Sequence, residues 1–355
     1  MGMQNFALTP ARIGKMKGMI MAHAMPVEVL SRQGRQISME ENQSDTYVAR
    51  RFLPYNSAST NANTINRFFT DGTGDRANAL VQANQLAEGI TPTPDSITPQ
   101  DTTVVIQQYG CLYGFTDKTY RLYEDNIPVE MTKQIGERVT LINELIIWGQ
   151  LRACTNQFYG GTGTSIATVN GGLTLNLIRK IVQSLQANHG KMVSRVLKAS
   201  GDYGSSAVAP GYFVYTHTDM EPDIRDLPNF TECIKYASGT PMPNEIGAVE
   251  RFRFITSPDL PSTQDGGAAI AATGLYSTTG ANIDVYQCIV VAENAWSQIS
   301  LRGKNSLNPT LLLPGEKSKA DPLGQRGYAG TSWWKTAFIE NNGWMAIVNV
   351  GRKSL

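Results

Sequence analysis

The sequence lacks closely spaced cysteines. Its four cysteines are Cys111, Cys154, Cys233 and Cys288, and no two of them form a Cys-x-x-Cys pair. This spacing excludes a zinc ribbon and a dithiol redox motif. We therefore expect four small apolar side chains, buried in a protein of a reducing compartment.

Charge is also scarce, because Asp, Glu, Lys and Arg make up 17% of the 355 residues, against about a quarter in an average domain. The net charge of +1 argues against a dedicated nucleic-acid binder. Lys and Arg outnumber Asp and Glu near both ends, over residues 1–53 and 296–355. A surface poor in charge suits a protein that its neighbours cover, although a stable secreted protein has a similar composition.

Long apolar runs are missing as well. No stretch approaches the roughly 18 apolar residues that a membrane-spanning helix needs. The segment Arg12–Met25 resembles a weak signal peptide, but its apolar part is short and contains His23. We expect neither export nor membrane association.

Sequence motifs for catalysis or cofactor binding are absent. There is no Walker A, Gly-x-Ser-x-Gly or His-Glu-x-x-His sequence. Gly72–Ala77 matches a dinucleotide-binding string, yet it lies in a long polar stretch and not between a strand and a helix. His217, Asp219 and Glu221 match no metal-ligand spacing, and Glu221 suits a capping box with Thr218. We expect no enzymatic activity, no cofactor and no bound metal.

A polar excursion separates two predicted strands in the first third of the chain. Residues 46–53 and 102–109 have strand-like patterns, whereas residues 54–101 contain few large apolar side chains. A loop this long is uncommon inside a compact domain, so we predict an extended β-arm. The first 39 residues hold seven of the twelve methionines and show no sustained period. They predict an N-terminal arm that lies on another surface.

The clearest periodic segment is a predicted helix over residues 128–153. Ile135, Val139, Ile142 and Ile146 recur at helical spacing, and Pro128 suits the first turn. Carboxylates also recur on it every seven residues, at positions 130, 137 and 144. Paired carboxylates can perform acid–base chemistry. We favour a charged stripe that is solvated or faces another subunit.

The last part of the chain predicts a hairpin. Strand-like residues 331–340 and 344–350 flank Asn341-Asn342-Gly343, and Asn-Gly is a strong hairpin signal. Trp333, Trp334, Phe338 and Trp344 gather there, and core packing is favoured over a sugar-binding or base-binding platform. A helix ending near residue 190 and strands near 212–215, 251–256 and 283–292 complete a mixed α+β pattern.

Several strings in fixed order carry a family resemblance. They are Gly89–Pro99 (GITPTPDSITP), Val104–Gly110 (VVIQQYG), Tyr113–Thr119 (YGFTDKT), Met131–Arg138 (MTKQIGER) and Pro314–Tyr328 (PGEKSKADPLGQRGY). Together they resemble the major capsid proteins of tailed bacteriophages, in the group named after the coliphage N-four. The resemblance extends from about Thr46 to Val350.

The resemblance implies the Hong Kong 97-type coat fold. Its parts would be an N-terminal arm (1–49), an extended β-arm (50–109), and a peripheral domain (110–170) with the spine helix at 128–153. A mainly axial domain (171–292) and a return to the peripheral sheet (293–355) would follow. Some relatives cross-link through Lys and Asn, but nothing in this sequence identifies such a pair.

The implied function is self-assembly into an icosahedral shell around double-stranded DNA. The expected partners are other copies, as hexamers and pentamers, with scaffolding, decoration and portal proteins and non-specific DNA contacts. The expected location is the virion capsid, assembled in the bacterial cytoplasm. Two alternatives remain: a tail or portal component, and a carbohydrate-binding β-rich protein. The candidate intersubunit residues are Arg50 and Arg51 at the arm base, and Glu130, Lys133, Glu137, Arg138 and Glu144 on the spine helix.

Overall fold

The computed structural model describes residues 25–42, 44–57, 62–65, 76–92, 94–123, 126–193, 210–236, 241–270, 274–301, 307–315, 317, 319 and 321–354, with 76–79 by their backbone alone. Residues 1–24 of the predicted N-terminal arm lie outside this set, as does most of the glycine string at 72–77. Among the described helices, none is both long and apolar enough to cross a bilayer.

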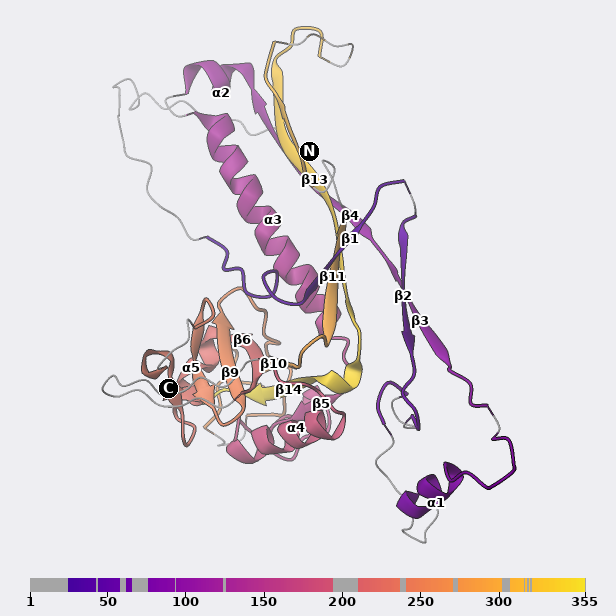
Figure 1. Cartoon of the computed structure of the whole chain (residues 1–355). Coiled ribbons are helices and arrows are strands. Elements are labelled where there is room, and N and C mark those ends of the chain that lie inside the picture. Colours follow the sequence, from indigo (N-terminus) through magenta and orange to yellow (C-terminus); the bar gives the residue numbers. More distant parts are fainter. Residues whose placement is uncertain are drawn as a thin grey trace.

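A long sheet and a long helix form the upper body of the molecule (Figure 1). The sheet contains β1 (Arg35–Met39), β11 (Trp296–Leu301), β13 (Arg326–Ile339), β12 (Leu307–Leu312) and β4 (Gln107–Thr116). Helix α3 (Ile127–Leu151) runs along this sheet, after the short helix α2 (Asp117–Leu122). Met131 and Ile135 of α3 pack against Phe115 and Trp333 of the strands. The predicted spine helix is thus present, with its ends shifted by one and two residues.

A seven-stranded sheet forms the second body. Its order is β5 (Gln157–Tyr159), β14 (Met345–Gly351), β10 (Val285–Val291), β6 (Tyr212–His217), β9 (Phe252–Ser257), β8 (Glu245–Val249) and β7 (Thr231–Glu232). Strand β6 explains why these strands are apolar throughout. Tyr212 and Val214 face the cluster that contains α4 (Leu175–Ala187), while Phe213 and Tyr215 face the C-terminal turns of α3. Both faces of the sheet are therefore buried.

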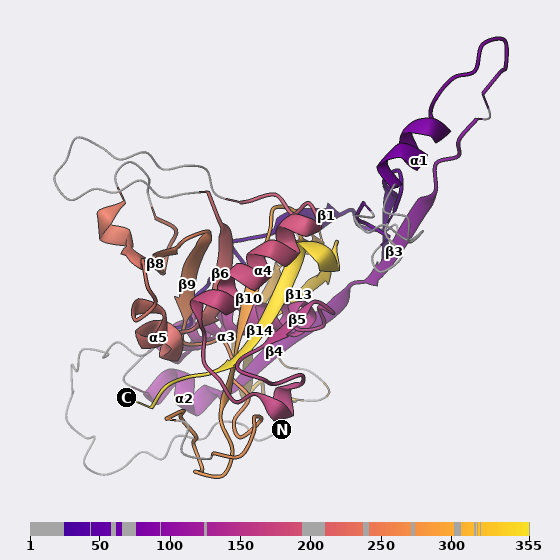
Figure 2. The ribbon, with the colours of Figure 1, turned by 90° about the horizontal axis from the view of Figure 1, so that it is seen from below.

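The predicted β-arm is present as a two-stranded ribbon that leaves both bodies (Figures 1 and 2). Strands β2 (Thr46–Phe52) and β3 (Pro99–Val105) pair antiparallel from Thr46↔Val105 to Phe52↔Pro99. Helix α1 (Arg76–Ala83) lies in the polar excursion, which the sequence pattern had marked only as a loop. The base of the ribbon packs on a small cluster that includes Ile106, Ile299 and Phe338.

The predicted C-terminal hairpin is wrong. Ile339 ends β13 in the long sheet, opposite Trp296, whereas Met345 begins β14 in the seven-stranded sheet, opposite Val291. Between them the Asn341 side chain accepts a hydrogen bond from the Gly343 N–H and starts a 3₁₀ turn, η5 (Asn342–Trp344). The chain passes from one sheet to the other through this turn. Residues 345–351 were expected to return to the long sheet, but they belong to the seven-stranded sheet.

Of two predicted helix caps, one differs from the structure. Helix α4 does end near residue 190 as predicted, with His189 in the left-handed region (φ 59°). Thr218 forms no capping box with Glu221. Instead the His217 side chain accepts from the Asp219 N–H and caps the 3₁₀ helix η3 (Thr218–Met220). The following helix, α5 (Glu221–Arg225), uses Glu221 in an ion pair with Arg225.

Candidate intersubunit surfaces

The β-arm carries an unusual number of exposed apolar side chains. They are Val48, Phe52, Tyr55, Ile65, Val81, Leu86, Ile90, Ile97 and Val105, each at least 44% exposed. Large contiguous apolar surfaces on a soluble chain mark interaction sites. An isolated two-stranded ribbon is marginally stable in water, and beyond its base the described part of this one has no third strand. The exposed apolar side chains make the arm a candidate surface for contact with another molecule.

Arg50 lies on β2 and pairs within its own arm. Its guanidinium donates to both carboxylate oxygens of Asp101 on β3, at 2.7 and 2.9 Å. The hydrogen bonds and the opposite charge raise the pKa of Arg50 and lower the pKa of Asp101. Both groups are in solvent, where such a pair contributes little to stability. Arg50 is thus paired across the two strands of its own arm, and its predicted ion pair with a neighbour stays a prediction.

Arg51 points to the other side of β2, toward the body. Its guanidinium donates to the main-chain oxygen of Glu340, at the end of β13. Burial lowers the pKa of Arg51, and the nearby Glu340 opposes that shift. The Glu340 carboxylate in turn accepts a hydrogen bond from the Ser297 hydroxyl. Arg51 therefore joins the arm to the body of its own chain, and its predicted contact with a neighbour is untested.

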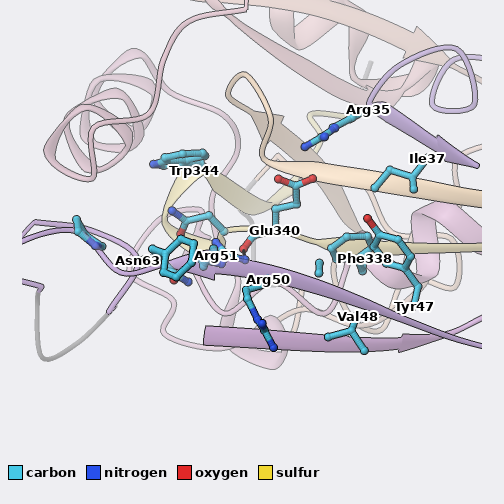
Figure 3. A pocket seen from close by; sticks show the side chains of 14 residues that line it. Arg35, Ile37, Tyr47, Val48, Arg50, Arg51, Asn63, Phe338, Glu340 and Trp344 are labelled. Atoms are coloured by element: carbon cyan, nitrogen blue, oxygen red, sulfur yellow. Dashed lines mark hydrogen bonds between the residues drawn. The ribbon is translucent and has the colours of Figure 1, made fainter. Parts of the chain in front are cut away.

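These groups line a pocket of about 470 Å³ between the arm and the body. Figure 3 shows Arg35 of β1 on one side of Glu340, with Arg50 and Arg51 of β2 on the other. Tyr47, Val48, Phe52, Phe338 and Trp344 supply apolar walls. The pocket thus combines guanidinium groups with aromatic surface at the base of the arm, and we call it the arm-base pocket.

Four of the five spine-helix candidates stay near the surface. Lys133 donates to Glu130 at 2.8 Å, and this pair spans three residues of α3. Glu137 is half-buried and Arg138 is exposed. Both residues continue the charged stripe along the N-terminal half of α3. Their proposed role in setting register between subunits is a prediction that a single chain does not test.

Glu144 does not belong to that stripe, and the expectation of a solvated or intersubunit position for it is wrong. Its side chain is 1% exposed. The N–H groups of Leu30 and Ser31 donate to its carboxylate at 2.9 and 2.7 Å, and the Ser31 hydroxyl donates as well. A seven-residue repeat drifts about 20° per heptad around a straight helix, and the C-terminal turns of α3 lie between the two bodies. Glu144 therefore fastens the segment before β1 to the spine helix.

Among the described residues, no group of three or more His, Cys, Asp or Glu side chains is placed to hold a metal. Burial raises the pKa of Cys154 and of Cys288 to about 11 in each case, so both thiols carry protons at neutral pH. Cys233, half-buried, is raised to about 11 by the same cause.

The C-terminal tryptophans form no common platform. Trp333 packs against α3 and donates to Asn143, while Trp344 donates to the main-chain oxygen of Asn188 near the end of α4. Trp334 lies with Phe338 at the base of the arm. The carbohydrate-binding alternative thus loses the cluster on which it rested.

A second apolar surface was not anticipated from the sequence. Strand β12 is exposed along its whole length, and Leu311, Leu312 and Leu313 are each at least 44% exposed. Leu323, beyond the following turns, is 71% exposed. The Leu311–Leu313 run was the available signal, but a short apolar run equally predicts a buried strand.

Comparison with solved structures identifies the fold. The chain aligns with the capsid protein of Ralstonia phage GP4 over 99% of each chain, at 9% identity and a TM-score of 0.61. It aligns with the capsid protein of cyanophage Pam1 over 99% of this chain and 100% of that one, at 13% identity and a TM-score of 0.56. The spine helix beside a long sheet, the projecting arm and the second sheet body make up the Hong Kong 97-type fold, which these phage capsid structures share.

Sequence comparison gives the family. The model of the phage capsid protein family matches residues 99–297, which is more than half of the chain. The major capsid protein of Pseudomonas phage KPP21 is 21% identical over 264 residues, covering 68% of this chain and 66% of that relative, just under two thirds of its length. This chain belongs to the phage capsid protein family.

Proposed function

We propose that this capsid protein is the principal subunit of a tailed phage head, and that it assembles with copies of itself into hexamers and pentamers of an icosahedral shell. The family match and the fold support a shell protein. The observation that carries self-assembly is the β-arm, whose exposed apolar side chains find no cover in the described part of their own chain. We further propose that the chain has no catalytic activity.

The arm must gain many contacts at once to become ordered. Fixing the backbone costs about 1–2 kcal/mol per residue, while fully burying one large aliphatic or aromatic side chain gains about 1.5–3 kcal/mol. A few apolar contacts therefore do not hold the distal arm on a single subunit, whereas a neighbour that covers most of the exposed row does. Repetition of such a head-to-tail contact closes a ring by rotation.

We assign the two bodies to different places in the capsomer. The long sheet with α3 forms the peripheral part, where the stripe from Glu130 to Arg138 faces the next subunit. The seven-stranded body forms the axial part around the capsomer centre. It includes β5 and β14 in addition to the residues first expected there. The exposed β12 and its leucines form a second contact between capsomers.

Other partners follow from the same assignment. The basic balance of both ends suits non-specific contact with packaged double-stranded DNA. Scaffolding, decoration and portal proteins are the remaining partners we propose, with assembly in the cytoplasm of the bacterial host and residence in the virion.

The test uses purified full-length protein and a shortened variant in which a Gly-Asn turn replaces residues 54–97. We expect uniform large particles, or pentamers and hexamers, for the full-length chain by light scattering and negative-stain imaging. The variant should keep the circular dichroism spectrum of a folded body and stay small. A full-length chain that remains monomeric at every concentration contradicts the proposal, and so does a variant that assembles as well as the full-length chain.

A further inference from the structure

The far end of the arm is a tight turn with one acidic and two apolar side chains. The Ile90 N–H donates to the Ala87 oxygen at 3.3 Å, and Gly89 adopts the left-handed region (φ 75°) between them. Leu86 and Ile90 are 74% and 70% exposed, and Glu88 is also exposed. Figure 2 shows the chain after α1 reaching the end of the arm, away from both bodies. We call Leu86–Ile90 the tip turn.

No basic side chain follows α1 in the described part of the arm. The sequence contains no Lys or Arg between Arg76 and Lys118. In the described part of the chain, Asp101 on β3 pairs with Arg50, whereas Glu88 makes no ion pair. An exposed carboxylate between two exposed apolar side chains is complementary to a pocket that has a cationic group and apolar walls.

The arm-base pocket has that character. Three guanidinium groups and one carboxylate line it, and Asp101 already neutralises Arg50. Arg35 is exposed and pairs with no carboxylate of the described residues. Arg51 donates to the main-chain oxygen of Glu340 and lies near the carboxylate of that residue. The walls include Phe52, Phe338 and Trp344, which can cover apolar side chains such as Leu86 and Ile90.

We propose that the tip turn of one subunit docks in the arm-base pocket of the next copy, with Glu88 meeting Arg35 and Arg51 and with Leu86 and Ile90 against the aromatic walls. The inference rests on the proposed shell function and names the partner of the arm. The turn beyond α1 lies at the far end of the arm, whereas the pocket lies at the base of the arm, where residues of β2 line it. The contact therefore joins two copies, and each pocket receives the tip that precedes it around a ring.

The experiment reverses the charges on the two sides of the contact. Glu88→Arg alone and Arg35→Glu alone should each lower the yield of rings or particles about tenfold or more, because each places like charges together. The double variant Glu88→Arg with Arg35→Glu restores the opposite signs and should recover most of the yield. As a matched control, Glu88→Arg is combined with Arg152→Glu, which has the same net charge but places the new carboxylate at the end of α3. This control should not recover.

A direct measurement accompanies the yields. Full-length protein with Glu88→Cys and Arg35→Cys, treated with an added oxidant after assembly, should give a ladder of covalent oligomers on a denaturing gel. Glu88→Cys with Arg152→Cys should give monomer.

The outcomes distinguish a failure of the proposed docking from a failure of the proposed shell function. If the unaltered chain forms no assemblies, the proposed function fails. If it forms shells but both single reversals assemble normally, or the control pair recovers as well as the matched pair, the tip does not use this pocket. If the variants misfold, the cysteine pair decides, and the absence of a ladder from an assembled shell overturns the docking.

Discussion

The carboxylate of Glu144 lies 2.9 Å from the main-chain nitrogen of Leu30 and 2.7 Å from that of Ser31, residues more than a hundred positions earlier in the chain. This arrangement resembles a helix cap in reverse, because a buried side chain of a helix satisfies the N–H groups of an extended segment. It also sets the place at which the N-terminal part of the chain meets the spine helix.

Loss of the Glu144 charge should release this segment. Glu144→Gln retains one acceptor oxygen but turns an amide toward donors, so a buried N–H loses its partner. We expect destabilisation of about 1–3 kcal/mol and faster proteolysis before Arg35. Urea unfolding of the unassembled subunit and limited digestion measure these changes. Glu130→Gln, which neutralises a half-buried carboxylate paired with Lys133 on the same helix, serves as the control and should change stability by less than about 0.5 kcal/mol.

The buried pair between Glu245 and Arg253 should be more sensitive. Arg253 donates to both carboxylate oxygens at 2.6 and 2.7 Å, and the Tyr236 hydroxyl donates to the same carboxylate. Glu245→Gln leaves a buried guanidinium without its counter-charge, at a cost of about 3–5 kcal/mol. Thermal unfolding of the variant should show a large fall in the midpoint. Arg179 pairs with Glu250 at the surface, and Arg179→Gln is the matched control. If Glu245→Gln lowers the midpoint as little as this control does, water reaches the Glu245 site.

Alkaline pH should weaken the fold through its buried thiols. Burial raises the pKa of Cys288 to about 11, above the usual value near 8.5. The folded state therefore holds this proton more tightly, so the contribution is complete below the usual pKa and is lost as pH rises toward 11. Cys288→Ala should flatten the fall in stability between pH 8.5 and 11, as measured by urea unfolding. An unchanged slope would assign the loss to other groups, such as Tyr286, whose pKa burial raises to about 12.

Gly34 should resist substitution for two separable reasons. Its φ of 76° disfavours any side chain, and an added Cβ would lie 2.6 Å from ring atoms of Trp296. Gly280 has a similar φ of 81° but open space around it. Gly280→Ala should cost about 1 kcal/mol for the backbone strain alone, and Gly34→Ala should cost clearly more. Equal losses in urea unfolding would show that the indole moves aside at no cost.

The local periods of the sequence predicted the elements that carry their own signal. The +4, +3, +4 spacing of Ile135, Val139, Ile142 and Ile146 predicted the spine helix. The contrast between residues 54–101 and their flanks gave the β-arm. In both cases the pattern is fixed by neighbours within a few residues, so no distant contact is needed to interpret it.

The errors arose where distant residues decide the outcome. Asn342-Gly343 favours a hairpin, yet Val291 and Trp296 recruit the two flanking strands into different sheets. The repeat from Glu130 to Glu144 suggested one stripe, but the last member lies beneath the segment that precedes β1. The arm-base pocket assembles residues from four separated stretches, and no spacing in the sequence indicates that they meet.

The hydrogen bond from Arg51 to Glu340 falls where the chain leaves β13 for the turn that leads into β14. The β-arm, the long sheet and the seven-stranded body therefore meet at this one hydrogen bond. A force that moves the arm acts on the backbone between the two bodies. We expect a change in the angle of the arm to change the tilt of one body against the other. In an assembled shell, the contact between neighbouring copies would thereby be coupled to the curvature of the lattice.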